Sequence, residues 1–259
     1  MPTYLDTILT AHRAAAAADG RELDELVAAA QQEPPARGFR DALTAAPGLA
    51  VIAEIKRRSP SAGDLAPDLE PDVLAKAYAD GGATCLSVLT DAEFFGGSVA
   101  DLSAARASSG VPVLRKDFTV SAADVCDARL IGADAVLLIV AALDDAELRQ
   151  FLELAADVGI DALVEVHDQP ELDRALAAGA TLVGVNQRDL STFRVDHERA
   201  ERLAAAIPAG VAKVAESGIR GGEDVRRAAG AGYDAVLVGE TLVTAADPTA
   251  AVRELLACS

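Results

Sequence analysis

Tryptophan is absent from this 259-residue chain, and cysteine and histidine occur three times each. The cysteines, Cys85, Cys126 and Cys258, form no Cys-x-x-Cys pair and are odd in number, which argues against a disulfide framework or a zinc cluster. The histidines, His12, His167 and His197, share no spacing typical of metal ligands, so we expect no metal site. We expect His12 and His197 at the surface and the protein in a reducing, cytoplasmic compartment.

Positive charge is also scarce. The chain has 23 lysines and arginines against 41 aspartates and glutamates, a formal net charge of −18. Such a field repels nucleic acids and anionic membranes, so we expect neither as a partner, and an anionic ligand needs a locally basic site. No apolar run approaches the roughly 18 residues that suggest a membrane span, and the first residues lack the pattern of a signal peptide.

What the chain does have is a repeat of short apolar runs and longer helical segments. The segments between the runs begin with acidic or polar residues and end with glycine, as helices do. Glycines 82, 132, 179 and 232 close similar segments, which indicates two βα units per period. The near-continuous apolar runs suit parallel strands covered on both faces, and they lie at 49–56, 85–90, 111–118, 135–143, 161–167, 182–188, 212–217 and 235–240.

Eight such units predict an α/β fold, a (β/α)₈ TIM barrel with an N-terminal helical extension. An open Rossmann-type sheet is the alternative, but its glycine fingerprint is missing after the first run. We expect residues 1–259 to form a single domain, with eight βα units over 49–259. Residues 1–48 contain two helical patterns, one through Leu5 and Ile8 and another through Leu23 and Leu26, and we expect them to cap the barrel.

Charged and polar residues recur where the predicted strands end. Active sites of such barrels lie at the carboxyl ends of the strands, and side chains alternate across a strand. A single pair, such as Glu54 and Lys56, is as readily a structural salt bridge. Repetition favours a site, because burying charge for stability alone is unfavourable. The residues concerned are Glu54 with Lys56, Lys116 with Phe118, Glu165 with His167, Asn186 with Arg188, and Glu216 with Ser217.

Glycines follow the last two predicted strands, in ESGIRGGEDV (216–225) and VGETLV (238–243). Backbone N–H groups at such turns bind phosphate well, and this is the usual location in a barrel. Each glycine is equally a turn residue, and Ser59 is equally a phosphate ligand or a capping residue. From the sequence alone, Phe94 and Phe95 are assigned to the core rather than to an aromatic wall.

These motifs resemble the indole-3-glycerol phosphate synthase family. The resemblance runs in order through EIKRRSPS (54–61), FFGGS (94–98), PVLRKDF (112–118), LLIVAAL (137–143), LVEVH (163–167), GVNQRDL (184–190), VAESGI (214–219) and VLVGE (236–240). It implies a lyase of L-tryptophan biosynthesis that converts 1-(2-carboxyphenylamino)-1-deoxyribulose 5-phosphate into indole-3-glycerol phosphate, CO₂ and water. It implies no cofactor and no metal, and a phosphorylated small molecule as the partner. We expect a monomer, with an oligomer as the alternative.

The resemblance also implies roles. Lys116 corresponds to the general acid, and nearby cations would give it a lowered pKa. Glu165, Glu54 and Lys56 match further acid and base positions, with their division of labour open, and Asn186 and Ser217 assist them. The residues implied in substrate binding are Ser59, Pro60, Phe95, Phe118, Leu137, Arg188, Glu216, Gly218, Gly239 and Glu240.

Two positions depart from common forms of the family. Ala62 stands where lysine is frequent, and Glu240 stands where serine is frequent, so the Glu240 carboxylate must point away from a phosphate bound by backbone. Three other readings stay open: an isomerase of the phosphoribosylanthranilate type, a Schiff-base aldolase with Lys116 as nucleophile, and a barrel that only binds a phosphorylated ligand.

Overall fold

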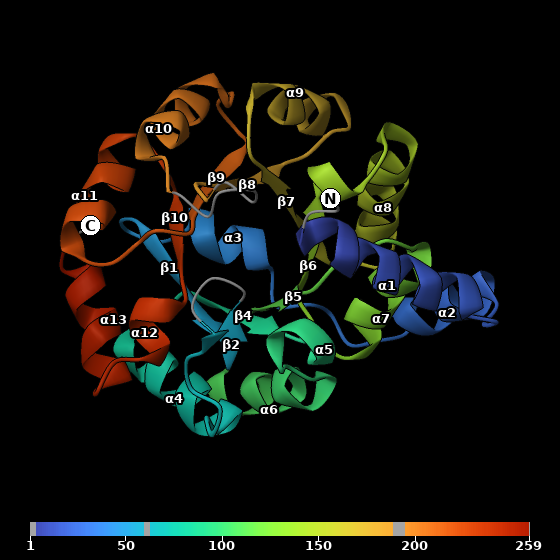
Figure 1. Ribbon diagram of the computed structural model, residues 1–259, viewed down its shortest axis with the longest axis horizontal. Helices are drawn as coiled ribbons and strands as arrows, with labels where there is room; N and C mark the ends of the chain where they lie inside the picture. The colour runs from blue at the N-terminus through green and yellow to red at the C-terminus, as the bar shows by residue number, and fades with distance from the viewer. Residues whose placement is uncertain (1–3, 60–62, 189–194, 259) are drawn as a thin grey trace.

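The computed structural model describes residues 4–59, 63–188 and 195–258. Eight parallel strands close into a barrel in the order β1-β10-β9-β8-β7-β6-β5-β4, which confirms the predicted fold (Figure 1). Each strand falls within one of the eight predicted apolar runs. The strands are β1 (Ala50–Ile55), β4 (Cys85–Leu89), β5 (Val113–Lys116), β6 (Ala135–Ile139), β7 (Asp161–Val166), β8 (Leu182–Asn186), β9 (Ala212–Glu216) and β10 (Ala235–Val238).

Helices surround the barrel as the repeat predicts. Capping boxes fix the starts of two of them, at Ser121 and Asp144. Gly82 ends another with φ 99°, a left-handed conformation that favours glycine. The helices after β1 are α4 (Pro71–Gly81), α5 (Ala92–Phe95), α6 (Val99–Ser109), α7 (Ala122–Leu130), η1 (Val140–Ala142), α8 (Asp145–Asp157), α9 (Gln169–Ala177), α10 (His197–Ala206), α11 (Gly222–Gly230), α12 (Glu240–Val243) and α13 (Pro248–Leu256).

The strands bury apolar side chains on both faces. Ala53 and Val164 belong to the cluster between barrel and helices, whereas Ile52, Leu114 and Leu163 belong to the cluster inside the barrel. The two-residue alternation therefore directs the charged residues of the strand ends toward the barrel axis. Two short strands, β2 (Arg58–Ser59) and β3 (Gly63–Asp64), pair in the loop after β1 and were not predicted.

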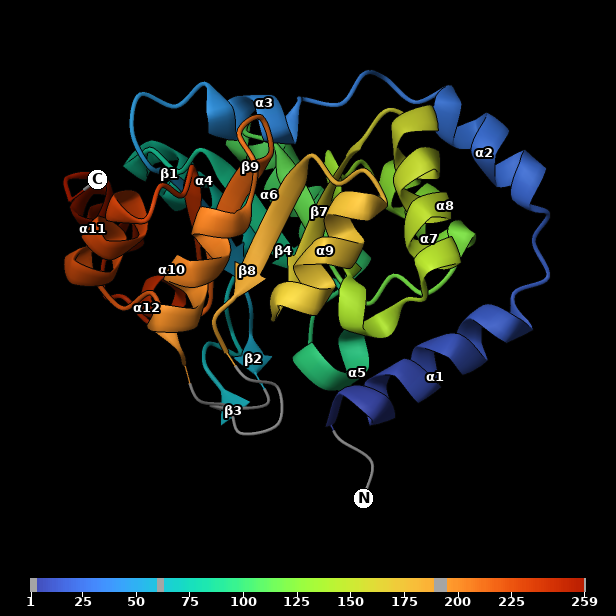
Figure 2. The ribbon, with the colours of Figure 1, turned by 90° about the horizontal axis from the view of Figure 1, so that it is seen from above.

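The N-terminal extension covers both ends of the barrel. It forms α1 (Tyr4–Ala18), α2 (Leu23–Gln31) and α3 (Phe39–Thr44). The third helix was missed, because six residues are too few for a periodic pattern. Phe39 and Leu43 pack into the cluster inside the barrel, and α3 closes the end where the strands begin, while α1 lies beside the opposite end (Figure 2). The expected cap is thus divided between the two ends.

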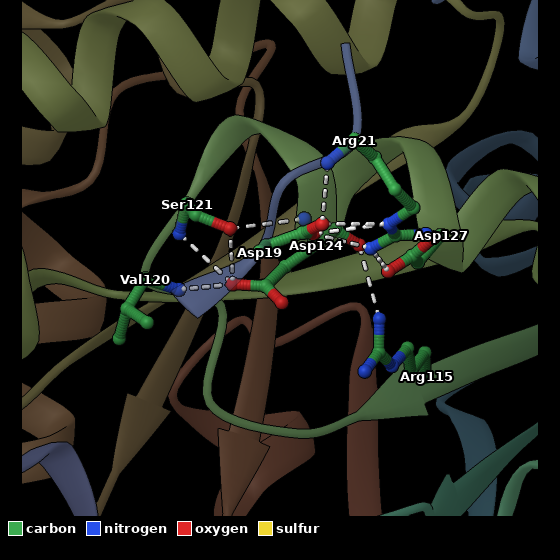
Figure 3. Close-up of polar contacts among 7 residues, drawn as sticks. All are labelled: Asp19, Arg21, Arg115, Val120, Ser121, Asp124 and Asp127. Carbon is green, nitrogen blue, oxygen red and sulfur yellow. Dashed lines mark hydrogen bonds and ion pairs between the residues drawn. The ribbon is translucent and has the colours of Figure 1, made fainter. Parts of the chain in front are cut away.

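Ion pairs fix α1 to the barrel. Arg21 bonds to Asp19 at 2.6 Å and to Asp127 of α7 at 2.7 Å, which ties the connection after α1 to that helix (Figure 3). His12 Nε2 lies 2.9 Å from Asp91 Oδ2, and Asp91 also caps α5. Among the helices of the described residues, none is both long and apolar enough to cross a membrane.

Candidate active site

A cavity of about 860 Å³ opens at the carboxyl ends of the strands. Its size suits a small organic substrate. Pro60 lies outside the described residues. The structure brings together every other catalytic or substrate-binding residue that the resemblance implies. Glu54, Lys56, Ser59, Phe95, Lys116, Phe118, Leu137, Glu165, Asn186, Arg188, Glu216, Ser217, Gly218, Gly239 and Glu240 all line the cavity, whereas His167, also named at a strand end, does not.

Lys116 is the central cation of the cavity floor. Its Nζ donates to Glu165 Oε2 at 3.0 Å and lies 3.6 Å from Glu216 Oε2. Asn186 Nδ2 donates to the other oxygen of Glu165, also at 3.0 Å. Strands β5, β7, β8 and β9 thus each contribute one polar side chain to a single buried network.

The charge environment of Lys116 differs from the expected one. Burial alone would lower its pKa, but the carboxylates of Glu165, Glu216 and Glu54 raise it overall. The prediction of a lowered pKa from neighbouring cations was therefore wrong, because carboxylates surround the ammonium group more closely. Burial raises the pKa of Glu165, yet Lys116 and His167 together bring it down to about 2. The resting site holds a charged lysine beside an ionised glutamate.

Glu216 behaves differently from Glu165. Burial, reinforced by the negative charges of Glu165 and Glu54, raises its pKa to about 8 although Lys116 opposes this. Its Oε1 atom is buried and makes no hydrogen bond with any described residue. The raised pKa favours the protonated form of Glu216, in which the carboxylic acid can donate a hydrogen bond to an oxygen of a bound ligand.

The end of β1 holds a second acid and base pair. Lys56 Nζ donates to Glu54 Oε1 at 2.5 Å, and the Ser87 hydroxyl donates to Glu54 Oε2 at 3.4 Å. Gly239 makes room for this pair, since a Cβ atom there would lie 2.5 Å from Glu54 Oε1. A glycine is therefore needed after β10 for two reasons: it forms the turn, and it lets the backbone lie close to Glu54 and Lys56.

An aromatic wall lines the cavity beyond β4 and β5. The rings of Phe95 and Phe118 lie 6.1 Å apart at a tilt of 38°. The assignment of Phe95 to the core was wrong, because α5 places its ring at the cavity, as the family resemblance implies. Tyr4, Leu5 and Ile8 of α1 also line the cavity, and their helical spacing was the available sequence signal.

Glycine turns line the end of the cavity near β9 and β10. Ser217 and Gly218 both have positive φ, 66° and 73°, and Ser217 is the one non-glycine residue with positive φ in the described part of the chain. Such paired turns point successive N–H groups into a concave surface suited to an anion. Arg220 and Thr241 line the same end and were missed as site residues. Arg220 could have been found as the one cation inside the glycine-rich ESGIRGG stretch.

One cluster of potential metal ligands forms although no spacing predicted it. His12, Asp91 and Asp117 bring their ligand atoms within 4.8 Å of one another. Arg115 Nη2 already pairs with Asp117 at 3.0 Å, so the cluster is a network of ion pairs beneath α1. His12 is therefore partly buried instead of being a surface residue, and His197 is also partly buried, bonded to Gln187 Oε1 at 2.6 Å.

Gly184 of β8 provides a test of the Glu216 position. A Cβ atom at Gly184 would lie 1.9 Å from Glu216 Oε1. We expect Gly184→Ala to displace this carboxyl group, lowering kcat/KM at least about tenfold and stability by about 1–3 kcal/mol. Steady-state kinetics and thermal melts measure both.

The matched control is Gly230→Ala in α11, where a Cβ would meet nothing within 4 Å. It should keep normal kinetics and gain up to about 1 kcal/mol, because alanine favours helix. Unchanged kcat/KM in Gly184→Ala would show that the position of Glu216 does not matter for turnover.

Residues 5–255 match the family model described as Indole-3-glycerol phosphate synthase. The chain belongs to this family. An indole-3-glycerol phosphate synthase from Mycobacterium ulcerans (strain Agy99) is 51% identical over 258 residues, which cover 98% of this chain and 94% of that relative. One from Mycobacteroides abscessus is 50% identical over 256 residues, with the same coverage of both chains.

Solved structures show the fold at much lower identity. 3-Hexulose-6-phosphate synthase from Salmonella typhimurium has a TM-score of 0.65 at 17% identity and covers 81% of this chain and 98% of its own. Thiamine phosphate pyrophosphorylase from Pyrococcus furiosus has a TM-score of 0.60 at 19% identity, covering 82% of this chain and 94% of its own. These likenesses concern the barrel alone, while indole-3-glycerol phosphate synthases share about half of the sequence.

Proposed function

We propose that this chain closes the indole ring of indole-3-glycerol phosphate in L-tryptophan biosynthesis. Its substrate is 1-(2-carboxyphenylamino)-1-deoxy-D-ribulose 5-phosphate, and its other products are CO₂ and water. The observation that carries the proposal is the placement of Lys116 between Glu165 and Glu216, in a cavity with an aromatic wall on one side and glycine turns on the other. Family membership supports the same reaction.

The chemistry assigns the first proton to Lys116. The ring carbon that bears the carboxylate bonds to the ketone carbon, and the ketone oxygen takes a proton from the Lys116 ammonium. The C–C bond to the carboxylate then breaks, CO₂ leaves, and the electron pair restores the aromatic ring. A buried ammonium hydrogen-bonded to one carboxylate is held in place for this donation.

Dehydration completes the ring. The hydroxyl group leaves as water after taking a proton, and a base removes the proton from the neighbouring carbon. Glu165, Glu54 and Lys56 serve as the acid and base groups of this stage, since all three line the cavity and each is hydrogen-bonded to a partner that holds it. Asn186 keeps Glu165 in position, and Ser217 orients the substrate at the end of β9.

Substrate binding divides between the two ends of the cavity. Phe95, Phe118 and Leu137 flank the aromatic ring of the substrate, and Arg188 and Glu216 bind its polar groups. At the other end, Ser59 and the backbone around Gly218, Gly239 and Glu240 hold the phosphate. Pro60, implied beside the ring, belongs to the same proposal although it lies outside the described residues.

The architecture supports a further part of the proposal. We propose that the whole chain acts as one domain, because α1 lines the cavity formed by the barrel and α3 packs into its interior. The three cysteines are free, as a cytoplasmic protein allows. We also propose a monomer, with an oligomer as the alternative.

The decisive experiment mixes the purified chain with this substrate in a chelating buffer and follows indole fluorescence. We expect fluorescence to rise with each equivalent of substrate consumed. An isomerase would give a rearranged ketose without loss of carboxylate, and an aldolase would form an adduct that borohydride traps on Lys116. Either result, or tight binding by calorimetry without any conversion, would contradict the proposal.

A further inference from the structure

His167 and Glu171 extend the buried network beyond Glu165. His167 Nε2 lies 3.4 Å from Glu165 Oε1, and Nδ1 lies 3.0 Å from Glu171 Oε2. The same Glu171 oxygen accepts the backbone N–H of His167 at 2.7 Å. Glu171 is in the first turn of α9, which directly follows β7 (Figure 1). The imidazole of His167 therefore lies between the carboxylate of Glu165, which lines the cavity, and the carboxylate of Glu171, which is nearer to solvent.

The row of groups runs from the interior toward solvent. The side chains of Glu165, His167 and Glu171 are 3%, 11% and 18% exposed. Because a carboxylate only accepts, Glu171 holds the Nδ1 proton of His167 and leaves Nε2 facing Glu165. Nε2 is buried and forms no aligned hydrogen bond with any described residue. A proton on Nε2 therefore has Glu165 as its nearest acceptor.

The proposed reaction takes up one proton from the solvent in each turnover. The carboxylate charge of the substrate leaves as neutral CO₂ while the phosphate keeps its charge, so each turnover consumes one proton. Lys116 loses its proton to the ketone oxygen and must regain one before the next cycle. Glu165 contacts Lys116 with Oε2 and faces His167 with Oε1, so its carboxylate joins the two.

We propose that His167, fixed by Glu171, is the positioning residue through which Lys116 regains its proton by way of Glu165; this inference rests on the proposed function. The Nε2–H bond of the imidazolium breaks and an O–H bond forms on Glu165. The carboxyl group turns, its O–H bond breaks, and the proton forms an N–H bond on Lys116. Nε2 then takes a new proton from water once the product has left the cavity.

The charges around His167 favour its protonated form, the imidazolium. Burial lowers its pKa, but the carboxylates of Glu171 and Glu165, with Glu216 of β9 further off, raise it overall. Lys116 of β5 faces the far side of Glu165. An imidazolium with a raised pKa stays charged through more of the neutral range, and its supply of protons falls as pH rises through that pKa. Steady-state kcat should therefore fall over the same pH range.

The test separates the first turnover from later ones in His167→Gln. Lys116 starts each experiment protonated, so we expect a first turnover within about threefold of normal and a steady-state kcat at least about tenfold lower. Stopped-flow fluorescence should show a burst that the unmodified protein lacks, and added imidazole should restore the later turnovers. Glu171→Gln should change kcat in the same direction, and Asp173→Asn, an exposed carboxylate on the same helix, should not.

Proton NMR titration of the three histidines supplies a readout without substrate. The pKa of His167 should lie above its usual range, fall in Glu171→Gln and stay unchanged in Asp173→Asn. Equal losses in first and later turnovers, no response to imidazole, or an unchanged kcat in His167→Gln would overturn the inference alone. No turnover by the unmodified protein would instead overturn the proposed function, and this inference with it.

Discussion

Lys116→Met is expected to lower kcat by about 10³-fold, while the affinity for the phosphorylated substrate changes far less. Methionine keeps the apolar stem but removes the ammonium group that lies between Glu165 and Glu216. General acid catalysis is worth about 10²–10⁴-fold, and in this site no other ammonium bonds to Glu165 among the described residues. Single-turnover fluorescence measures the chemical step, and calorimetry measures binding.

The matched control is Lys76→Met on α4. Lys76 is exposed and pairs with Asp80 at 3.1 Å, a surface contact worth about 0.5 kcal/mol or less. The Lys76→Met variant should have unchanged kcat and unchanged affinity for the substrate. A Lys116→Met protein that melts normally and retains near-normal kcat would remove Lys116 from the acid role.

Glu165→Gln is expected to reduce kcat by about 10²-fold or more with KM within about threefold of normal. The amide keeps the volume and a contact with Asn186, but it neither takes up a proton nor holds the Lys116 ammonium by charge. A loss confined to kcat marks an interaction that matters in the transition state. Steady-state kinetics at saturating and limiting substrate separate the two constants.

This substitution should also move the pH profile. The negative charge of Glu165 helps to raise the pKa of Glu216 to about 8, so its removal lets Glu216 ionise at lower pH. The alkaline limb of kcat/KM should shift downward by a measurable amount. The control Glu153→Gln changes an exposed carboxylate of α8, and it should change neither kcat nor the pH profile. A rise in KM alone would make Glu165 a binding residue.

The strands and their charged ends could be predicted because each depends on local chemistry. Short stretches of sequence contain these signals: apolar runs of strand length, glycines at helix ends and alternating side chains. Glu54, Lys116 and Glu165 were therefore located correctly at one end of the barrel. α3 and the β2–β3 pair could not be predicted, because both are too short for a periodic pattern. The position of α3 also depends on distant contacts, such as that of Phe39 inside the barrel.

The electrostatics of the site depend on contacts that a sequence does not show. The raised pKa of Lys116 follows from carboxylates on β1, β7 and β9, which are brought together only when the barrel closes. The position of Phe95 depends on a four-residue helix, too short to be read from periodicity. His167 was noticed at a strand end, but its partner Glu171 comes from the following helix.

The central claim is that this cavity couples loss of the carboxylate to closure of the indole ring through Lys116. Substrate labelled with carbon-13 in its carboxylate allows CO₂ and the indole product to be counted in the same quenched samples. The account predicts equal amounts of both from the unmodified protein at every time point, and neither above background from Lys116→Met. Indole product without CO₂, CO₂ without indole product, or full activity in Lys116→Met would contradict it.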